Sequence, residues 1–269
     1  MSAYEIQERL LTIENLSLTL NGRPILRDVN LAIENIVRPG VFQGQVVAVL
    51  GPSGVGKTQL FRCMAGLQQP TKGQVLLNEV KKPVTAGEVG VVFQNYPLLN
   101  HRTIWDNLRL ATDNAGRSPN EISELLQRFG LLEKRDVYPA QLSGGQRQRI
   151  SIIQQLLCST HFMLMDEPFS GLDVLMKQKM VDLIIEVSLS HELNTIIVTT
   201  HDIETACQIA DTIWILGHQY DEAGAQIPGA TLIKTMDLIE RGLAWHPDVK
   251  RHPNFRPTCD ELNAIFNTL

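Results

Sequence analysis

One eight-residue segment, Gly51-Pro-Ser-Gly-Val-Gly-Lys57-Thr58, constrains the fold of this 269-residue chain more than any other feature. Its glycines allow a tight loop whose backbone N–H groups all point inward, as they do around a bound anion. The apolar run Val46–Leu50 before the loop predicts a buried strand, and Lys57–Gly66 after it predicts a helix. The N-terminus of that helix adds the positive end of a dipole. We therefore expect a strand, loop and helix that together hold phosphate groups.

This spacing, G-x-x-x-x-G-K-[ST], assigns a role to each residue type. Lys57 places a cation against the β- and γ-phosphates of a nucleoside triphosphate, and Thr58 offers its hydroxyl to Mg²⁺. The predicted phosphate cradle consists of Gly51, Pro52, Ser53, Gly54, Val55, Gly56, Lys57 and Thr58. By itself the loop indicates a nucleotide and no particular reaction, because kinases and GTPases share it.

Two acidic residues, Asp166 and Glu167, directly follow a second apolar run, His161–Met165. In a doubly wound sheet, a carboxylate at the carboxyl end of a strand lies at the edge where the phosphate loop lies. We expect Asp166 to hold Mg²⁺, directly or through water, and Glu167 to act as general base towards an attacking water.

The remaining pattern predicts an α/β fold. Leu11–Leu20 and Val29–Ile33 predict a short antiparallel pair, and the Pro-Gly-containing stretch Glu34–Gly44 predicts a turn. Buried strands, joined by an amphipathic helix at Met176–Ser190, imply a parallel sheet with right-handed crossovers. Further expected elements are strands at Gln74–Leu77, Val89–Phe93, Thr195–Thr199 and Thr212–Leu216, helices at Ile104–Leu132 and Ile150–Leu157, a loop at Tyr220–Pro228, and an apolar helix face at Glu261–Leu269.

Composition narrows the classes of partner. The net charge of -5 disfavours a nucleic-acid binder, which usually carries a basic face. Four cysteines, far apart and without a Cys/His cluster, are typical of reduced thiols and not of a zinc site. The N-terminus lacks a secretory pattern, and no run approaches the ~20 apolar residues of a membrane helix. If the protein acts at a membrane, we expect it to dock onto another chain.

A third segment, Leu142-Ser143-Gly144-Gly145-Gln146, resembles the signature motif of ABC ATPases. Gln94 resembles the Q-loop glutamine of that family, Asp173 in Ser170-Gly-Leu-Asp173 resembles its D-loop, and His201 resembles its switch histidine. A lone Gln or His would be an ordinary surface residue, but the ordered set, spanning about Leu11 to Leu216, is specific.

The resemblance implies a P-loop NTPase (RecA-like) core with a parallel sheet, an N-terminal antiparallel β subdomain and an inserted α-helical subdomain. Residues 1–269 would form a single ABC ATP-binding domain, with the helical subdomain at about 95–160 and a C-terminal tail at about 220–269.

The resemblance also implies the site. Two cassettes would pack head to tail around two ATP molecules, with the signature segment of one cassette facing the cradle of the other. The residues expected to contact ATP are those of the cradle together with Gln94, Ser143, Gly144, Gly145, Gln146 and Asp173. Mg²⁺ would be held by Thr58, Gln94 and Asp166, and catalysis would be carried by Glu167 and His201.

Two function classes remain. The first is the motor subunit of a transporter, peripheral on the cytoplasmic face of the cell membrane. We expect two such subunits per complex, with membrane permease subunits as partners. The stretch from Gln94 to Leu108 resembles bacterial importer cassettes, which favours import and a solute-binding protein as a further partner. The second is a soluble ABC ATPase of an assembly machine, of the iron–sulfur cluster type, without membrane partners. Tyr96, Leu98, Leu99 and Trp105 either line a groove for a membrane-domain helix or form subdomain core.

Two departures from the family pattern stand out. Leu20 occupies the region in which the family usually places an aromatic residue against adenine, and no aromatic residue occurs between Tyr4 and Phe42. The stretch Glu34–Gln43 is longer than the usual turn before the cradle strand. Neither departure affects the residues expected to contact phosphate.

Overall fold

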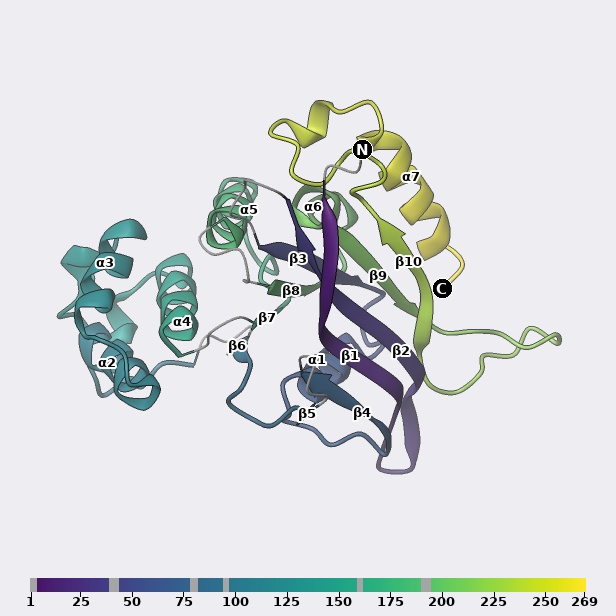
Figure 1. Cartoon of the computed structure of the whole chain (residues 1–269), viewed down its shortest axis with the longest axis horizontal. Helices are drawn as coiled ribbons and strands as arrows, with labels where there is room; N and C mark the ends of the chain where they lie inside the picture. Colours follow the sequence, from purple (N-terminus) through teal and green to yellow (C-terminus); the bar gives the residue numbers. More distant parts are fainter. Residues whose placement is uncertain (1–3, 39–43, 78–81, 94–96, 159–161, 190–194) are drawn as a thin grey trace.

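The computed structural model describes residues 4–38, 44–77, 82–93, 97–158, 162–189 and 195–269. It contains two β-sheets with helices between and around them (Figure 1). The first sheet is antiparallel, in the order β2-β1-β4-β5. Its strands are β1 (Glu5–Leu20), β2 (Arg23–Val37), β4 (Lys72–Leu77) and β5 (Lys82–Pro83).

The hairpin of β1 and β2 is longer than the sequence predicted. Glu34–Val37, expected in a turn, continues β2 and pairs with the start of β1, where Ile6 lies opposite Ile36 and Glu5 opposite Val37. The inward alternation of Leu31 and Ile33 runs on through Asn35, which is buried. The start of β1 is rich in charge and has no strand signal of its own, so only this pairing makes it a strand. The rest of the turn prediction, residues 39–43, lies outside the described residues.

The second sheet has six strands in the order β10-β9-β3-β8-β7-β6. The five strands from β9 to β6 in this order run parallel to one another, and the edge strand β10 is antiparallel to β9. Their bounds are β3 (Gln45–Leu50), β6 (Gly90–Val92), β7 (Phe162–Asp166), β8 (Thr195–Thr200), β9 (Thr212–Gly217) and β10 (Thr231–Asp237). All residues of β3, β7 and β8 are buried, which explains why these strands are almost continuously apolar. The predicted parallel sheet is thus confirmed.

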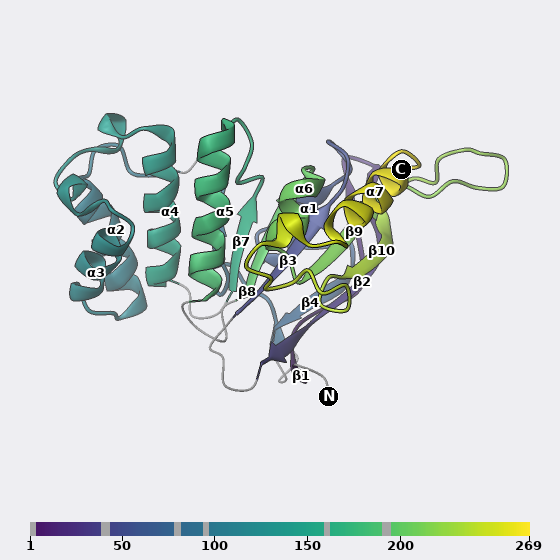
Figure 2. The same cartoon turned by 90° about the horizontal axis from the view of Figure 1, so that it is seen from above.

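Each face of this sheet packs against a different layer. Val47 and Val49 of β3 join a core formed with α1 (Lys57–Met64) and the antiparallel sheet. Ala48 and Leu50 join a second core on the opposite face. That face is covered by α5 (Val174–Ser188), α6 (Ile203–Ile209) and α7 (Phe255–Phe266), as Figure 2 shows.

Three helices form a group beside the sheets, between β6 and β7 in the chain (Figure 1). They are α2 (Ile104–Ala115), α3 (Asn120–Arg128) and α4 (Gly144–Cys158). The capping residue Thr103 accepts a hydrogen bond from the Asp106 N–H and begins α2, and Gly116, in a left-handed conformation, ends it. Short 3-10 turns occur at Leu132–Lys134, Pro139–Gln141 and Val249–Arg251. Across the part of the chain that is described, no helix is long and apolar enough to cross a membrane.

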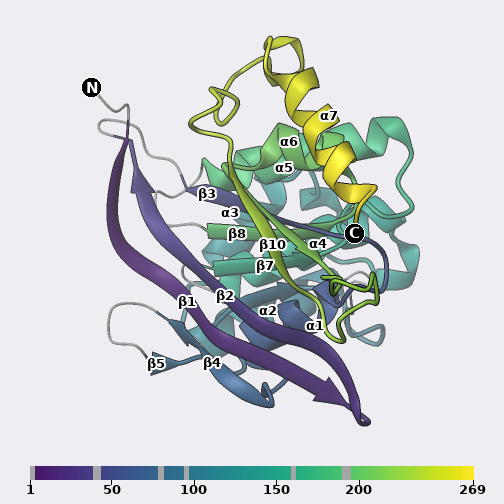
Figure 3. The ribbon, with the colours of Figure 1, turned by 90° about the vertical axis from the view of Figure 1, so that its right-hand side faces the viewer.

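The C-terminal tail packs onto the molecule through α7 (Figure 3). Leu262 is fully buried, and Ile265, Phe266 and Leu269 pack against the same core, which confirms the predicted apolar helix face. Two elements here were not predicted. Strand β10 is recognisable only by its pairing with β9, and α6 has seven residues, too few for a clear period.

The junction of β3, β9 and the tail contains a buried carboxylate, Asp211. Its Oδ2 accepts a hydrogen bond of 2.7 Å from the Val46 N–H, and its backbone oxygen accepts one of 2.9 Å from the Leu238 N–H. Burial raises the pKa of Asp211 to about 8. The hydrogen bond from the Val46 N–H and the positive charge of Arg38 partly oppose this rise, whereas the negative charge of Asp237 adds to it.

Because the folded state holds this proton more tightly than the unfolded state, we predict that the free energy of unfolding falls as pH rises from about 4 to about 8. The expected slope is on the order of 1 kcal/mol per pH unit. Asp211→Asn keeps an acceptor for Val46 and removes the ionisation, so its stability should vary less over this range. Urea unfolding at several pH values tests this, with Asp136→Asn on the surface as control. Parallel pH profiles for wild type and Asp211→Asn would contradict the prediction.

Candidate functional site

The cradle predicted from the sequence lies between the end of β3 and the start of α1. Gly54 and Gly56 adopt left-handed φ values of 82° and 111°, which residues with a side chain rarely adopt. A Cβ on Gly51 would lie 2.6 Å from the backbone oxygen of Leu216, at the end of β9. The glycines therefore provide both the turn and the close approach to the neighbouring strand.

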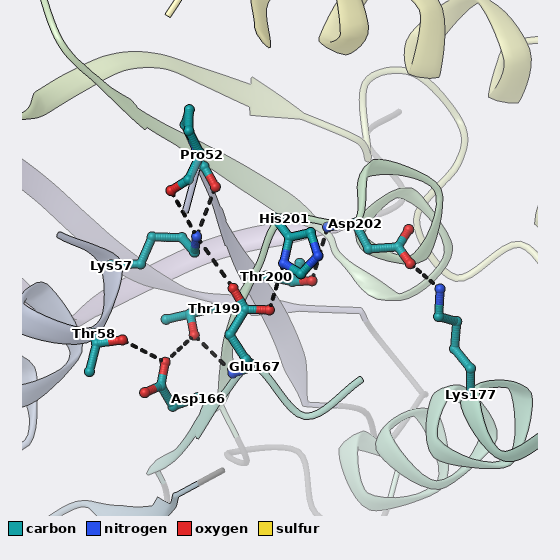
Figure 4. A network of polar contacts seen from close by, with 11 residues as sticks. Pro52, Lys57, Thr58, Asp166, Glu167, Lys177, Thr199, Thr200, His201 and Asp202 are labelled. Atoms are coloured by element: carbon teal, nitrogen blue, oxygen red, sulfur yellow. Dashed lines mark hydrogen bonds and ion pairs between the residues drawn. The ribbon is translucent and has the colours of Figure 1, made fainter. Parts of the chain in front are cut away.

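Lys57, the first residue of α1, has its ammonium inside this loop. Its side chain is 6% exposed, and Nζ donates to the backbone oxygens of Gly51 at 2.8 Å and Pro52 at 3.2 Å (Figure 4). Nζ also lies 3.3 Å from Oε1 of Glu167. A buried cation needs such partners, and its position inside the loop suits a phosphate group.

Thr58 and Asp166 are brought together, although they are 108 residues apart in the chain. Thr58 Oγ1 lies 3.3 Å from Asp166 Oδ1, and Asp166 is only 8% exposed. A hydroxyl and a carboxylate are hard oxygen donors of the kind that Mg²⁺ prefers, so these two residues fit a magnesium ion.

Thr199, near the end of β8, orients both acidic residues, and sequence reasoning missed it. Its hydroxyl donates to Asp166 Oδ1 at 2.6 Å and accepts from the Glu167 N–H at 3.1 Å. The only feature of the sequence that pointed to Thr199 was its position at the end of a predicted strand, two residues before His201. Because β7 and β8 are parallel neighbours with Asp166 opposite Thr199, this contact follows from their register.

Glu167 connects Lys57 to His201. Its φ is 48°, a left-handed value that is uncommon for a residue with a side chain. Its N–H donates to the backbone oxygen of Thr199 at 3.1 Å, and Oε2 lies 3.0 Å from His201 Nδ1 (Figure 4). One carboxylate thus contacts a buried cation on one side and a half-exposed imidazole on the other. An ion pair between Lys177 and Asp202 joins the starts of α5 and α6 next to this group.

The signature segment does not lie at the cradle of its own chain. Ser143 and Gln146 cap α4 reciprocally: the Gln146 N–H donates to Ser143 Oγ at 3.3 Å, and the Ser143 N–H donates to Gln146 Oε1 at 2.9 Å. Gly144 and Gly145 form the first turn of α4, among the helices beside the sheets and away from α1 (Figure 1).

Asp173 caps α5, accepting a hydrogen bond of 2.8 Å from the Met176 N–H. The structure also shows a contact that the sequence did not reveal. The buried side chain of Gln148 donates a hydrogen bond of 2.7 Å to the backbone oxygen of Pro168. This bond ties α4 to the loop that follows Glu167. Gln94, the remaining predicted ATP and Mg²⁺ contact, lies outside the described residues, as does Tyr96.

With this geometry established, the chain can be compared with known proteins. Residues 35–170 match the family model described as "ABC transporter". The chain is 35% identical to the spermidine/putrescine import ATP-binding protein PotA of Spiroplasma citri over 219 residues, which are 78% of this chain and 60% of that protein. It is 36% identical to the methionine import ATP-binding protein MetN of Photobacterium profundum, over 71% of this chain and 57% of that protein. The chain thus spans less than two thirds of these two relatives.

Another relative is covered more fully. The L-cystine import ATP-binding protein TcyC of Bacillus subtilis is 34% identical over 76% of this chain and 85% of that protein. The fold is similar to that of cbiO1 from Clostridium perfringens, part of the ABC transporter complex cbiONQ, with a TM-score of 0.71, 24% identity and coverage of 96% and 100%. The predicted fold class and the predicted family are therefore confirmed: the protein belongs to the ABC transporter family.

Proposed function

We propose that the protein is the ATP-binding and ATP-hydrolysing motor subunit of a membrane ABC importer. The observation that carries this proposal is the continuous contact from Lys57 through Glu167 to His201, directly beside the oxygen pair of Thr58 and Asp166. Phosphoryl transfer to water requires a cation that binds phosphate, a carboxylate that acts as base, and oxygen ligands for a metal ion.

Each residue has a defined task. Cradle amides and Lys57 bind the β- and γ-phosphates, and Thr58, Asp166 and Gln94 would hold Mg²⁺, which neutralises phosphate charge when bound. Water attacks the γ-phosphorus, and the bond from that phosphorus to the β–γ bridging oxygen breaks, giving ADP and phosphate. Glu167 accepts the proton of the water, and His201, in contact with Glu167, positions the water and the γ-phosphate.

A second cassette would complete the site. The N-terminus of α4 is exposed and is formed by Ser143, Gly144, Gly145 and Gln146. It is suited to bind the γ-phosphate of an ATP molecule that lies in the cradle of another chain. After Asp173, Val174 is 88% exposed and Leu175 66% exposed, an apolar pair that supports a protein interface there. ATP would then close the dimer and hydrolysis would release it, giving a two-state switch.

The partners and domain limits follow the same proposal. Residues 1–269 form one ABC ATP-binding domain, with the helical subdomain at about 95–160 and a tail from about 220. In the helical part, Leu99 is exposed, whereas Leu98 and Trp105 pack against the core. Leu99 is therefore better placed than the other two to line a groove for a membrane-domain helix. The protein would lie on the cytoplasmic face of the membrane, bound to two permease subunits and supplied by a solute-binding protein.

The relatives discriminate between the two function classes. PotA, MetN and TcyC are all named as import ATP-binding proteins. These names support import and do not favour a soluble ATPase of the iron–sulfur assembly type.

We predict that Glu167→Gln lowers the turnover number for ATP hydrolysis at least about 100-fold, because a general base contributes on this scale. The amide keeps the shape of the side chain, so the dissociation constant for ATP should change little. Phosphate release and equilibrium binding measure the two effects. Glu133→Gln, on an exposed turn, is the control. Unchanged turnover in Glu167→Gln would refute the assignment of the base.

Thr199→Val should lower turnover about tenfold or more, because it removes the hydroxyl that holds Asp166 and Glu167. Thr195→Val, at the opposite end of the same strand, is the matched control. Both threonines are buried, and in both cases valine preserves the shape of the side chain and removes only the hydroxyl. Steady-state ATPase assays and thermal unfolding should separate lost positioning from lost stability. Equal loss of activity in both variants would contradict a specific role for Thr199.

Purification of Glu167→Gln from its native cells, in mild detergent with ATP, should recover two multi-span membrane proteins with the cassette. The variant slows release of the closed dimer and so favours the intact complex. Mass spectrometry identifies the bound proteins, and an accompanying extracytoplasmic binding protein would support import. Recovery of a soluble partner with no membrane protein would overturn the transporter assignment and leave the ATPase mechanism intact.

A further inference from the structure

His201 lies on a short connection between two secondary-structure elements. It follows Thr200, the last residue of β8, and precedes Asp202, the capping residue of α6. Its side chain is 55% exposed, and the polar contact described for its ring is the one of 3.0 Å between Nδ1 and Glu167 Oε2. The position of the imidazole therefore depends on how the backbone on each side of it is held.

The backbone before and after His201 is fixed in different ways. Thr200 belongs to the sheet, where it is buried and lies opposite Leu50 of β3. Asp202 is fixed by local hydrogen bonds: its N–H donates to Thr200 Oγ1 at 3.1 Å, and its Oδ1 accepts one of 3.0 Å from the Thr205 N–H. The second bond caps α6. Asp202 is thus the point at which the chain after His201 is attached to the rest of the molecule.

The other carboxylate oxygen of Asp202 binds a cation from a separate part of the chain. Its Oδ2 pairs with Nζ of Lys177 on α5, as Figure 4 shows. Burial by itself would raise the pKa of Asp202, but hydrogen bonds from Lys177 and Thr205 lower it below its usual value. Asp202 is therefore ionised at neutral pH, and the contact is a partly buried ion pair.

Lys177 is itself held at the start of α5. Its N–H donates to the Asp173 backbone oxygen at 2.8 Å, and the Asp173 side chain caps the same turn. In Figure 4, Lys177 lies on the side of His201 opposite Lys57. None of the contacts described for Lys177 reaches the phosphate site, so its route to that site runs through Asp202 and the neighbouring histidine.

We propose that Lys177 is a positioning residue for the hydrolysis reaction: its ion pair with Asp202 holds the backbone that places His201 beside Glu167. This inference rests on the role of His201 in the proposed function and adds a residue outside the phosphate site. Without the ion pair, Asp202 still caps α6 but is no longer tied to α5. The imidazole then spends less time in the geometry that the reaction requires.

The test measures steady-state hydrolysis of ATP with Mg²⁺ by the full chain. Lys177→Met should lower the turnover number about fivefold, because an ion pair of this kind contributes on that scale. The KM for ATP should stay unchanged, because the cradle is untouched. Lys177→Arg keeps the positive charge and should keep most of the turnover. Lys179→Met, at an exposed position two residues further along α5, is the matched control, and thermal unfolding checks that each variant is folded.

A double variant separates positioning of His201 from a general structural effect. If Lys177 acts through His201, the substitution Lys177→Met causes no further loss of turnover in a chain that already carries His201→Ala. Single-turnover phosphate release can measure the low rates of these variants. A structural defect at the start of α5 would instead lower the rate by the same factor in both backgrounds.

The outcomes separate this inference from the proposed function. Unchanged turnover in Lys177→Met, an equal loss in Lys179→Met, or a further fivefold loss in the His201→Ala background would overturn the role of Lys177 and leave the ATPase assignment in place. If His201→Ala hydrolyses ATP at the wild-type rate, the role of His201 in the proposed function fails, and this inference fails with it.

Discussion

The buried ammonium of Lys57 is the interaction on which the site depends. A cation that is only 6% exposed has lost most of its hydration and needs polar or charged partners in its place. Lys57 finds them in two backbone oxygens of its own loop and in the carboxylate of Glu167. This single group connects the strand–loop–helix unit to the second acidic strand end. Because both loop oxygens belong to the turn made possible by the glycines, the position of the charge and the shape of the loop depend on each other.

The parallel sheet supplies the remaining geometry. Strands β3, β7 and β8 run in the same direction, so their carboxyl ends present Lys57, Glu167 and His201 at one edge. Register then sets the finer contacts: Thr199 lies opposite Asp166, and its hydroxyl binds both the Asp166 carboxylate and the backbone N–H of Glu167. The left-handed backbone of Glu167 is held by bonds to the same threonine, which offset the cost of that conformation.

Sequence reasoning was most successful where the pattern is local. The buried strands β3, β7 and β8 each contain an uninterrupted apolar run, and the cradle has a fixed spacing, so both were predicted nearly in place. It was less successful where pairing between distant segments creates the element. Strand β10 and the first residues of β1 have mixed polar sequences, and hydrogen bonds to a partner strand make them strands. Thr199 and Gln148 were missed for a related reason, since neither belongs to a recognisable motif.

Residue type and spacing in the sequence alone predicted the phosphate cradle with Lys57 and Thr58 and the acidic pair, and the resemblance to ABC ATPases added His201. Tertiary structure alone decided how these groups meet. It placed Glu167 between Lys57 and His201, separated the signature segment from the cradle of its own chain, and joined Ala230, just before β10, to β2 by backbone hydrogen bonds. The physical reason is that a local sequence pattern reflects only which strand, loop or helix a residue can adopt with its neighbours in the chain. Contacts across the sheet depend on register and on crossovers, which only the packed chain defines.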